Sequence, residues 1–239
     1  MKLNCRRQTD WCSGANLNNA PPSLPSPAPG GAGATLDAGD KWIEVVRRQH
    51  NPEVVVFANL LNAVECDALI LAAKPRLSRS LTVNTHTGQE ALHPDRTSQG
   101  MFFERLENEL IYRIEARIAK LLRWPVKYGE GLQVLRYRKG AQYLPHYDYF
   151  DARDAGTPLL LARGGQRVAT LIIYLNQPAA GGATVFPDLD LHIAPKRGQA
   201  VFFSYPLALP SSLSLHGGEP VAAGEKWIAT KWLRQHEFT

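Results

Sequence analysis

The sequence predicts an α+β fold in which a jelly-roll or other barrel-like β-core is buttressed by helices from the N-terminal half. Two observations support this prediction. Helical spacing of apolar residues is confined to the chain before residue 123, whereas short β-branched and aromatic runs separated by turn residues follow residue 131. A chain of 239 residues with 44% apolar residues can also bury one substantial core. We therefore expect one folded domain with an appendage.

The first 40 residues are expected to form a disordered leader, and residues 41–239 the folded domain. The leader is rich in Pro, Gly, Ala, Ser and Asn, with PPSLPSPAPGGAGA at its centre. Such a segment lacks the apolar side chains that would offset the conformational entropy lost on folding. Its composition also permits a second role, as a polyproline II ligand for an adaptor protein.

Two helices are expected between residues 62 and 122. The first begins at Asn62, where Glu65 completes a capping box, and it ends before Pro75. The second covers about 99–122, where apolar residues recur at steps of three and four residues. The polar residues 78–97 between the helices are expected to form a loop.

Short strands account for most of the remaining apolar residues. Each is a run of β-branched, aromatic or aliphatic residues bounded by turn residues. One strand is expected before the first helix and the others after the second. The expected strands are VVVF at 54–57, LQVLRYR at 132–138, VATLIIYL at 168–175, ATVF at 183–186, LHI at 191–193, AVFF at 200–203 and WIATKWL at 227–233.

The composition argues against several functional classes. The net charge is +5, but the 27 basic residues form no concentrated arm, so nucleic-acid binding is not expected. The three cysteines are an odd number, which makes a disulfide framework improbable. The N-terminus lacks the apolar region of a signal peptide, and no apolar stretch is long enough to span a bilayer. We expect a cytoplasmic protein that acts away from membranes.

Three residues form a candidate metal site. The segment YLPHYDYF places His146 and Asp148 two residues apart, so both side chains project from one face of an extended chain. His216, in the small-residue stretch LHGGEP, is a third candidate ligand. Two histidines and one carboxylate leave open positions on an octahedral metal, as in Fe(II) enzymes that bind a co-substrate and O2. Zinc hydrolases use similar ligands, usually in a helical His-Glu-x-x-His that is absent here.

Lys226 directly precedes the strand-like run WIATKWL, ten residues after His216. A lysine is costly to bury in an apolar strand unless an anion accompanies it. An acidic co-substrate such as 2-oxoglutarate would provide that anion. The simpler interpretation is a lysine at the edge of the strand with its amine in water.

Five segments, in order and at suitable spacing, resemble the prolyl 4-hydroxylase family of Fe(II)- and 2-oxoglutarate-dependent dioxygenases. The resemblance covers roughly residues 50–236. The resemblance implies a double-stranded β-helix, which is a jelly-roll core. The segments are RTSQGMFF (96–103), VLRYRKGAQYLPHYDYF (134–150), RVATLIIYLN (167–176), GGATVFP (181–187) and LHGGEPVAAGEKWIATKWLR (215–234).

The resemblance also implies roles for individual residues. The three candidate ligands would bind Fe(II), and the lysine at the start of the last strand would hold the distal carboxylate of 2-oxoglutarate. Tyr137 and Thr184 match positions that add hydroxyl contacts to this co-substrate, and Trp232 matches a residue packed near it. Tyr143 and Arg167 match positions beside the target proline. Without the resemblance, each of these five would be interpreted as a core or strand residue.

The reaction implied is hydroxylation of proline in a peptide or protein by O2, coupled to oxidative decarboxylation of 2-oxoglutarate to succinate and CO2. Ascorbate would serve as reductant, and the protein would be a monomer or homodimer. Three alternatives stay open: a hydroxylase of free amino acids or other small molecules, a catalytically silent peptide-binding module, and a nucleic-acid repair dioxygenase. The last is disfavoured because such enzymes typically carry arginine where Lys226 stands. Residues 78–97 and 151–165 are expected to be mobile lids over the peptide.

One position departs from the family pattern. In some similar enzymes a histidine follows two residues after the position of Trp232, whereas this chain has Arg234.

Overall fold

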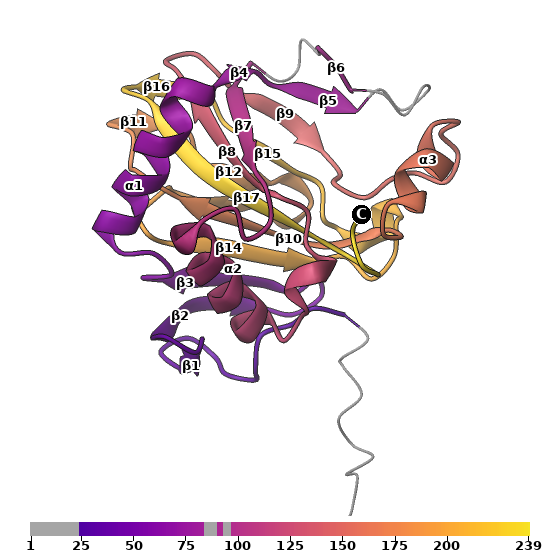
Figure 1. Cartoon of the computed structure of the whole chain (residues 1–239), viewed down its shortest axis with the longest axis horizontal. Coiled ribbons are helices and arrows are strands. Elements are labelled where there is room, and N and C mark those ends of the chain that lie inside the picture. Colours follow the sequence, from indigo (N-terminus) through magenta and orange to yellow (C-terminus); the bar gives the residue numbers. More distant parts are fainter. Residues whose placement is uncertain (1–23, 84–89, 93–96) are drawn as a thin grey trace, which may run out of the picture.

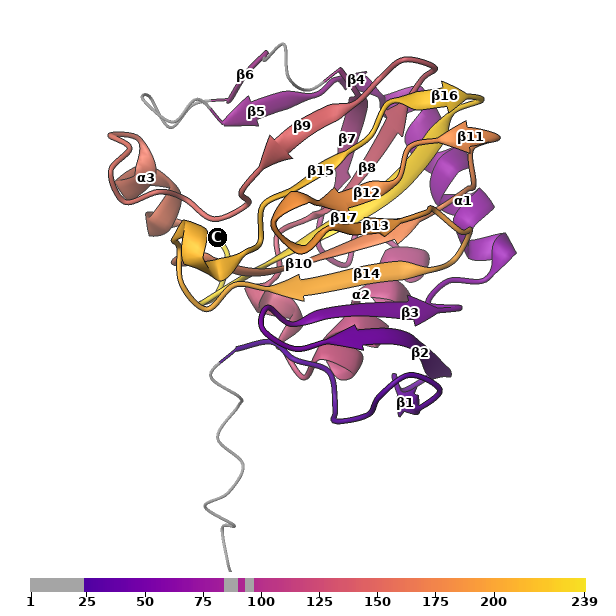
Figure 2. The ribbon, with the colours of Figure 1, turned by 180° about the vertical axis from the view of Figure 1, so that it is seen from behind.

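Two antiparallel sheets form the centre of the computed structural model, which describes residues 24–83, 90–92 and 97–239 (Figures 1 and 2). The large sheet has the strand order β1-β2-β3-β14-β10-β17-β8-β7-β4, and the small sheet has the order β13-β12-β15-β9. The large-sheet strands are β1 (Thr35–Asp37), β2 (Trp42–Gln49), β3 (Val54–Ala58), β14 (Ala200–Ser204), β10 (Arg167–Tyr174), β17 (Lys226–Arg234), β8 (Leu132–Tyr137), β7 (Gln99–Phe103) and β4 (Ser78–Arg79). Those of the small sheet are β13 (Leu191–Ile193), β12 (Thr184–Phe186), β15 (His216–Gly218) and β9 (Tyr143–His146).

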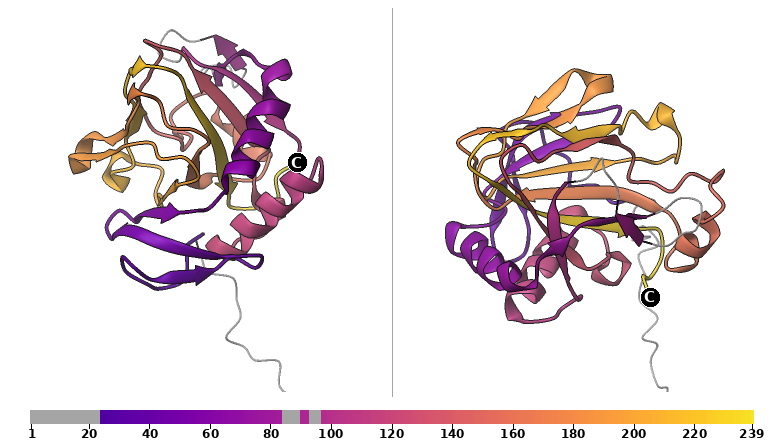
Figure 3. Two further views of the ribbon diagram at one scale, coloured as in Figure 1. Left: turned by 90° about the vertical axis from the view of Figure 1, so that its left-hand side faces the viewer. Right: turned by 90° about the horizontal axis from the view of Figure 1, so that it is seen from above.

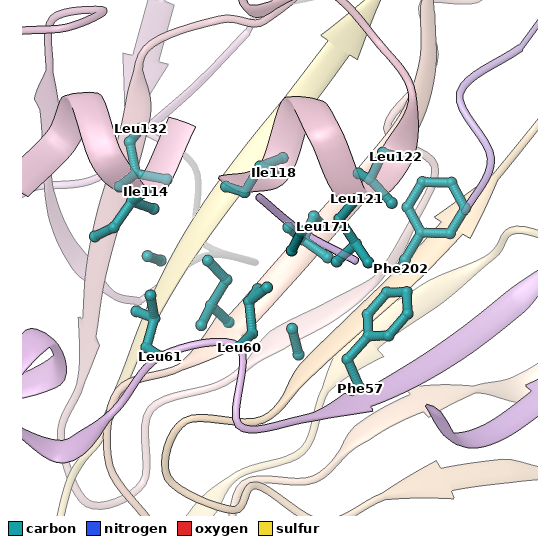
Figure 4. Packing of buried hydrophobic residues seen from close by; sticks show 14 of the residues in the cluster. Phe57, Leu60, Leu61, Ile114, Ile118, Leu121, Leu122, Leu132, Leu171 and Phe202 are labelled. Carbon is teal, nitrogen blue, oxygen red and sulfur yellow. The ribbon is translucent and has the colours of Figure 1, made fainter. Parts of the chain in front are cut away.

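Helices α1 (Ala63–Ala73) and α2 (Glu109–Leu122) lie on the outer face of the large sheet (Figures 1 and 3). The layer between the helices and the sheet is a cluster of buried apolar residues. Figure 4 shows part of it: Phe57, Leu60, Leu61, Ile114, Ile118, Leu121, Leu122, Leu132, Leu171 and Phe202.

Alternation along β10 links the two layers. Leu171 and Ile173 pack in the cluster under the helices, whereas Ile172 and Tyr174 pack in a second cluster with residues of the small sheet. Successive side chains of a strand point to opposite faces, so one strand contributes to both cores. The arrangement confirms the predicted α+β fold with a jelly-roll core buttressed by helices.

Most elements expected from the sequence are present. Each predicted strand overlaps an observed one within about two residues. Asn62 caps α1 in a full capping box: its side chain accepts a hydrogen bond from the backbone N–H of Glu65, and the Glu65 carboxylate accepts from the backbone N–H of Asn62. Local signals therefore fixed these elements.

The helix expected over 99–122 is wrong in its first half. Residues 99–103 form β7, which pairs with β8 and buries Met101 and Phe103. Asn108 then caps α2 by accepting a hydrogen bond from the N–H of Ile111. Apolar side chains alternate every second residue in 99–103, which is typical of a strand. The cap at Asn108 then starts the helix, so the helical spacing begins only with the residues of α2.

The expected leader is also wrong in its second half. Within residues 24–40, β1 pairs with β2 and Leu36 is buried. The guanidinium of Arg48 donates to the backbone oxygen of Ala28, so polar contacts supplement the few apolar side chains. Residues 1–23 lie outside the described residues.

The two predicted loops contain short regular elements. β4 pairs with β7, β5 (Leu81–Val83) pairs with β6 (Glu90–Leu92), and α3 (Thr157–Ala162) lies within 151–165. A further two-stranded ribbon joins β11 (Ala180–Gly181) and β16 (Val221–Ala223). Residues 84–89 and 93–96 of the first loop lie outside the described residues. No helix in the described chain is long and apolar enough to cross a membrane.

Candidate functional site

A pocket that is open to solvent lies between the two sheets. Its walls come from β8, β10 and β17 of the large sheet and from β9, β12 and β15 of the small sheet. Every site residue predicted from the sequence lines it, with the exception of Arg167. The lining residues are Leu135, Tyr137, Tyr143, His146, Asp148, Thr170, Ile172, Thr184, His216, Gly217, Gly218, Glu219, Lys226, Ile228, Thr230 and Trp232.

Strand pairing brings the three candidate metal ligands together. His146 ends β9 and stands opposite His216, the first residue of β15, in the antiparallel register. Asp148 follows two residues later, with Oδ1 3.6 Å from Nε2 of His146 and Oδ2 3.5 Å from Nε2 of His216. The three ligand atoms lie within 4.8 Å of one another. Residues 70 positions apart in the chain therefore face one point.

Hydrogen bonds select the ring nitrogen that each histidine offers. Nδ1 of His146 lies 2.8 Å from the backbone oxygen of Leu144, and Nδ1 of His216 lies 3.0 Å from that of Ser214. A carbonyl can only accept, so each Nδ1 carries the proton and each Nε2 presents a lone pair to the centre. Burial lowers the pKa of His216 to about 4, despite the opposing charge of Asp148. A neutral imidazole is the form that binds a metal.

Asp148 supplies the anionic ligand. Burial alone would raise the pKa of its carboxyl, but His216, His146 and Arg167 together hold the pKa well below its usual range. Oδ2 also accepts a 2.7 Å hydrogen bond from the hydroxyl of Thr170. The group is thus ionised, and two imidazole nitrogens with one carboxylate oxygen form a donor set suited to Fe(II) with open positions.

Lys226 lies on the inner face of β17, where burial lowers the pKa of its amine to about 8. The amine sits 5.8 Å from the ring centre of Tyr137 and 5.6 Å from that of Tyr174. Within the described chain no carboxylate forms a salt bridge with it, although the negative charge of Glu219 opposes the lowering. The alternative of a water-exposed strand-edge lysine is excluded, because Lys226 is only 3% exposed.

The remaining predicted residues occupy different parts of the cavity. Tyr143 stacks on His146 with ring centres 3.7 Å apart. The hydroxyl of Thr184 accepts a 2.8 Å hydrogen bond from Tyr174. Trp232 is buried, and no hydrogen-bond partner for its indole N–H is found in the described residues. These positions suit contacts with a bound molecule, which stay predictions.

Arg167 lies behind the cavity wall rather than in it. Its guanidinium makes a two-pronged contact with the buried carboxylate of Glu130, at 2.7 and 2.9 Å, and lies 4.0 Å from the ring centre of Trp232. Arg234, which stands where some similar enzymes have histidine, contacts the same carboxylate at 2.9 Å. The predicted position of Arg167 beside a target proline is untested by these contacts.

Sequence reasoning missed the residues that support the ligands. Thr170 and Tyr205 form a hydrogen-bonded chain to Asp148, and Glu130 holds the two arginines. One signal was present for Thr170, because it is a polar residue at an inward-facing position of an apolar strand. No sequence signal identified Tyr205 or Glu130, whose partners lie at least 30 residues away.

Comparison with known proteins agrees with this geometry. Residues 132–234 match the model of the 2OG-Fe(II) oxygenase superfamily. Prolyl 4-hydroxylase 5 of Arabidopsis thaliana is 39% identical over 221 residues, which cover 84% of this chain and 74% of the relative. Prolyl 4-hydroxylase 1 of the same plant is 39% identical over 203 residues, or 77% and 70% of the two chains.

A solved structure shows the same likeness. The viral collagen prolyl hydroxylase of Paramecium Bursaria Chlorella virus-1, in its 2OG complex, superposes with a TM-score of 0.58 at 33% identity. The match covers 76% of this chain and 95% of the viral one. Together with the two histidines and the aspartate around one point, these findings show that the chain belongs to the prolyl 4-hydroxylase family of Fe(II)- and 2-oxoglutarate-dependent oxygenases.

Proposed function

We propose that this enzyme hydroxylates proline at C4 within a peptide or protein, using Fe(II), 2-oxoglutarate and O2, with ascorbate as reductant. The observation that carries the proposal is one cavity containing both the His146, Asp148 and His216 cluster and the buried amine of Lys226. The names of the relatives support proline as the target. We further propose that it acts in the cytoplasm as a monomer or homodimer.

In this proposal the cluster holds the metal, and the lysine end of the cavity holds the co-substrate. When bound, Fe(II) would supply the O2 chemistry that couples decarboxylation of 2-oxoglutarate to hydroxylation. The two imidazoles and the ionised Asp148 would hold the metal without filling its coordination positions, and the carboxylate would offset one of its two positive charges. Lys226 would neutralise the distal carboxylate of 2-oxoglutarate, and the hydroxyls of Tyr137 and Thr184 would orient it.

Tyr143 supports a substrate larger than a free amino acid. Its ring covers His146 and lines a cavity that is open to solvent, so an extended segment can continue past the residue being modified. Arg167 is committed to Glu130 and to the backbone oxygen of Asp148, at 3.4 Å. We therefore assign it to shaping the wall through Trp232, with any contact to the peptide coming from its exposed edge.

A competition between substrates tests the proposal. The enzyme is incubated with Fe(II), 2-oxoglutarate and ascorbate, and with proline-rich peptides, free proline or a methylated oligonucleotide. Mass spectrometry follows addition of one oxygen, fragmentation locates it, and succinate is quantified. We expect hydroxyproline in peptides at one succinate each. Turnover of free proline alone would favour the small-molecule hydroxylase. Loss of the methyl group from the oligonucleotide, released as formaldehyde, would favour the repair enzyme. Absence of succinate with every substrate would favour the silent binding module.

A matched variant distinguishes product formed by the enzyme from product formed without it. Asp148→Asn keeps the size of the side chain but removes the anionic ligand, so both hydroxyproline and succinate should fall to the level of a reaction without enzyme. Omitting ascorbate tests the reductant: we expect the first turnovers to be unchanged and later ones to decline. An undiminished time course without ascorbate would remove that part of the proposal.

A further inference from the structure

A chain of buried hydroxyl groups leads to the carboxylate of Asp148. The hydroxyl of Thr170, on β10, lies 2.7 Å from Oδ2 of Asp148 and 2.9 Å from the hydroxyl oxygen of Tyr205. Tyr205 follows β14 directly, and its backbone N–H donates to the oxygen of Val168 at 3.0 Å. Antiparallel pairing of β10 with β14 thus fixes the two hydroxyls relative to each other. All three side chains are buried.

The direction of the hydrogen bonds follows from the charge on Asp148. An ionised carboxylate has no proton to give, so the single proton of the Thr170 hydroxyl points to Oδ2. The hydroxyl of Tyr205 must then donate to Thr170. Burial and the charge of Asp148 raise the pKa of Tyr205 well above its ordinary value, which keeps this donor protonated. The chain therefore runs one way, from Tyr205 through Thr170 to Asp148.

The hydrogen-bonded chain distinguishes the two carboxylate oxygens of Asp148, whereas their distances to the imidazole nitrogens do not. Oδ1 and Oδ2 lie 3.6 and 3.5 Å from the nearest imidazole nitrogens, so either oxygen is close enough to share a metal with the histidines. Only Oδ2 receives a hydrogen bond from a neutral side chain in the described residues. A lone pair committed to that donor is less available to a cation.

We propose that Tyr205 and Thr170 are positioning residues that hold Asp148 so that Oδ1 alone binds the metal. A carboxylate that binds through one oxygen occupies one coordination position, which leaves room for both a chelating co-substrate and O2. The inference rests on the proposed metal role of Asp148. Its competitor is a purely structural role, in which the two hydroxyls satisfy each other within the aromatic packing around Tyr205.

Metal affinity distinguishes the two roles, because packing alone would not change it. The dissociation constant of Co(II), an oxygen-stable probe, is measured on metal-free protein by competition with a coloured chelator. Thr170→Val removes the donor at constant shape and should weaken binding about 10- to 100-fold, the range for losing a group that orients a metal ligand. Thr170→Ser keeps the hydroxyl and should bind within about twofold of the wild type.

Tyr205→Phe tests the far end of the chain. Thr170 keeps its bond to Asp148 but loses the partner that fixes its rotation, so we expect a smaller loss, about threefold to tenfold. In the double variant Tyr205→Phe should add nothing to Thr170→Val, because the chain is already broken. Tyr174→Phe is the matched control, because Tyr174 donates to Thr184 at 2.8 Å in an equally buried pair. Tyr174 makes no hydrogen bond to Asp148 in the described residues, so Co(II) affinity should stay unchanged.

The outcomes separate failure of this inference from failure of the proposed function. If wild-type protein binds no Co(II), the metal site itself is wrong. If wild-type protein binds it and Thr170→Val binds equally well, or if the losses in the double variant add in full, the positioning chain is refuted. Thermal unfolding of each metal-free variant checks folding. If Thr170→Val does not fold, the test is the comparison of Co(II) affinity between Tyr205→Phe and Tyr174→Phe. Equal affinities of these two variants would overturn the inference.

Discussion

Replacing Lys226 with methionine should have two opposite effects, one on ligand binding and one on stability. Methionine keeps the length and apolar stem of lysine but carries no charge. In the ligand-free protein the buried amine has no salt bridge in the described chain, and its pKa falls from 10.5 to about 8. The folded protein therefore holds a buried cation without a salt-bridge partner in the described chain, and in the proposed function a bound dicarboxylate would neutralise it.

The effect on 2-oxoglutarate follows from the loss of a buried ionic partner. Truncating one member of such a pair costs about 2–4 kcal/mol, or roughly 30- to 1,000-fold in the dissociation constant. The ligand-free protein already bears the free-energy cost of desolvating the amine of Lys226. Binding of 2-oxoglutarate therefore does not include that cost. Metal affinity should be unaltered, since Lys226 makes no hydrogen bond or salt bridge with any of the three candidate ligands in the described chain.

The effect on stability has the other sign. Below pH 8 the amine is protonated in both the folded and the unfolded chain, and the lowered pKa corresponds to an unfavourable contribution on the order of 3 kcal/mol in the folded state. Between pH 8 and 10.5 only the unfolded chain keeps the proton, so this penalty fades as pH rises. Ligand-free Lys226→Met should therefore be more stable than the wild type at pH 7, and the difference should vanish by about pH 10.5.

Isothermal titration of Co(II)-loaded protein with 2-oxoglutarate measures the first effect, and urea unfolding of ligand-free protein measures the second. Lys231→Met is the matched control, since Lys231 is a buried lysine of the same strand whose amine bonds to Glu115. Its loss strands a buried carboxylate and should lower stability by about 3–5 kcal/mol. Unchanged 2-oxoglutarate affinity in Lys226→Met, with Co(II) still bound, would refute the anchor assignment.

Three further predictions use independent observables. In wild-type protein 2-oxoglutarate affinity should decline as pH rises through about 8, as the amine of Lys226 loses its proton, whereas the methionine variant should show no such decline; a flat wild-type profile contradicts this. His146→Ala should weaken Co(II) binding more than about 100-fold, beyond the range for residues outside the ligand set, and retained affinity would remove His146 from the site. Deleting residues 1–40 should lower the free energy of unfolding by more than about 3 kcal/mol relative to a chain that begins at residue 24, because β1 and the buried Leu36 are lost; equal stabilities would show that this segment contributes nothing.

The metal cluster was predictable because much of its geometry is local. His146 and Asp148 are two residues apart on an extended segment, so their shared face follows from strand geometry alone. His216 needed more, since its place opposite His146 depends on pairing between β9 and β15. The resemblance supplied that long-range link, and spacing along the chain did not.

The parts that sequence reasoning missed are those set by distant partners. Tyr205 is 35 residues from Thr170, and Glu130 is 104 residues from Arg234, so neither pair leaves a local pattern. The boundary between β7 and α2 was missed for a related reason. Met101 and Phe103, two residues apart, fit strand alternation, but they precede the helical spacing of α2 closely, and pairing with β8 is what separates the two elements.

Strand β17 explains why the co-substrate pocket and the helical layer depend on each other. Lys226, Ile228, Thr230 and Trp232 alternate along its inner face and line the cavity. Lys231 faces the other way and bonds to Glu115 of α2. Slipping the strand by one residue would exchange the two faces. The slip would remove the amine of Lys226 from the cavity, where we propose that it binds 2-oxoglutarate, and it would leave the carboxylate of Glu115 without its partner under the helix. The buried ion pair between Lys231 and Glu115 thus opposes the slip that would remove Lys226 from the cavity. The register of β17 therefore determines which side chains the cavity contains.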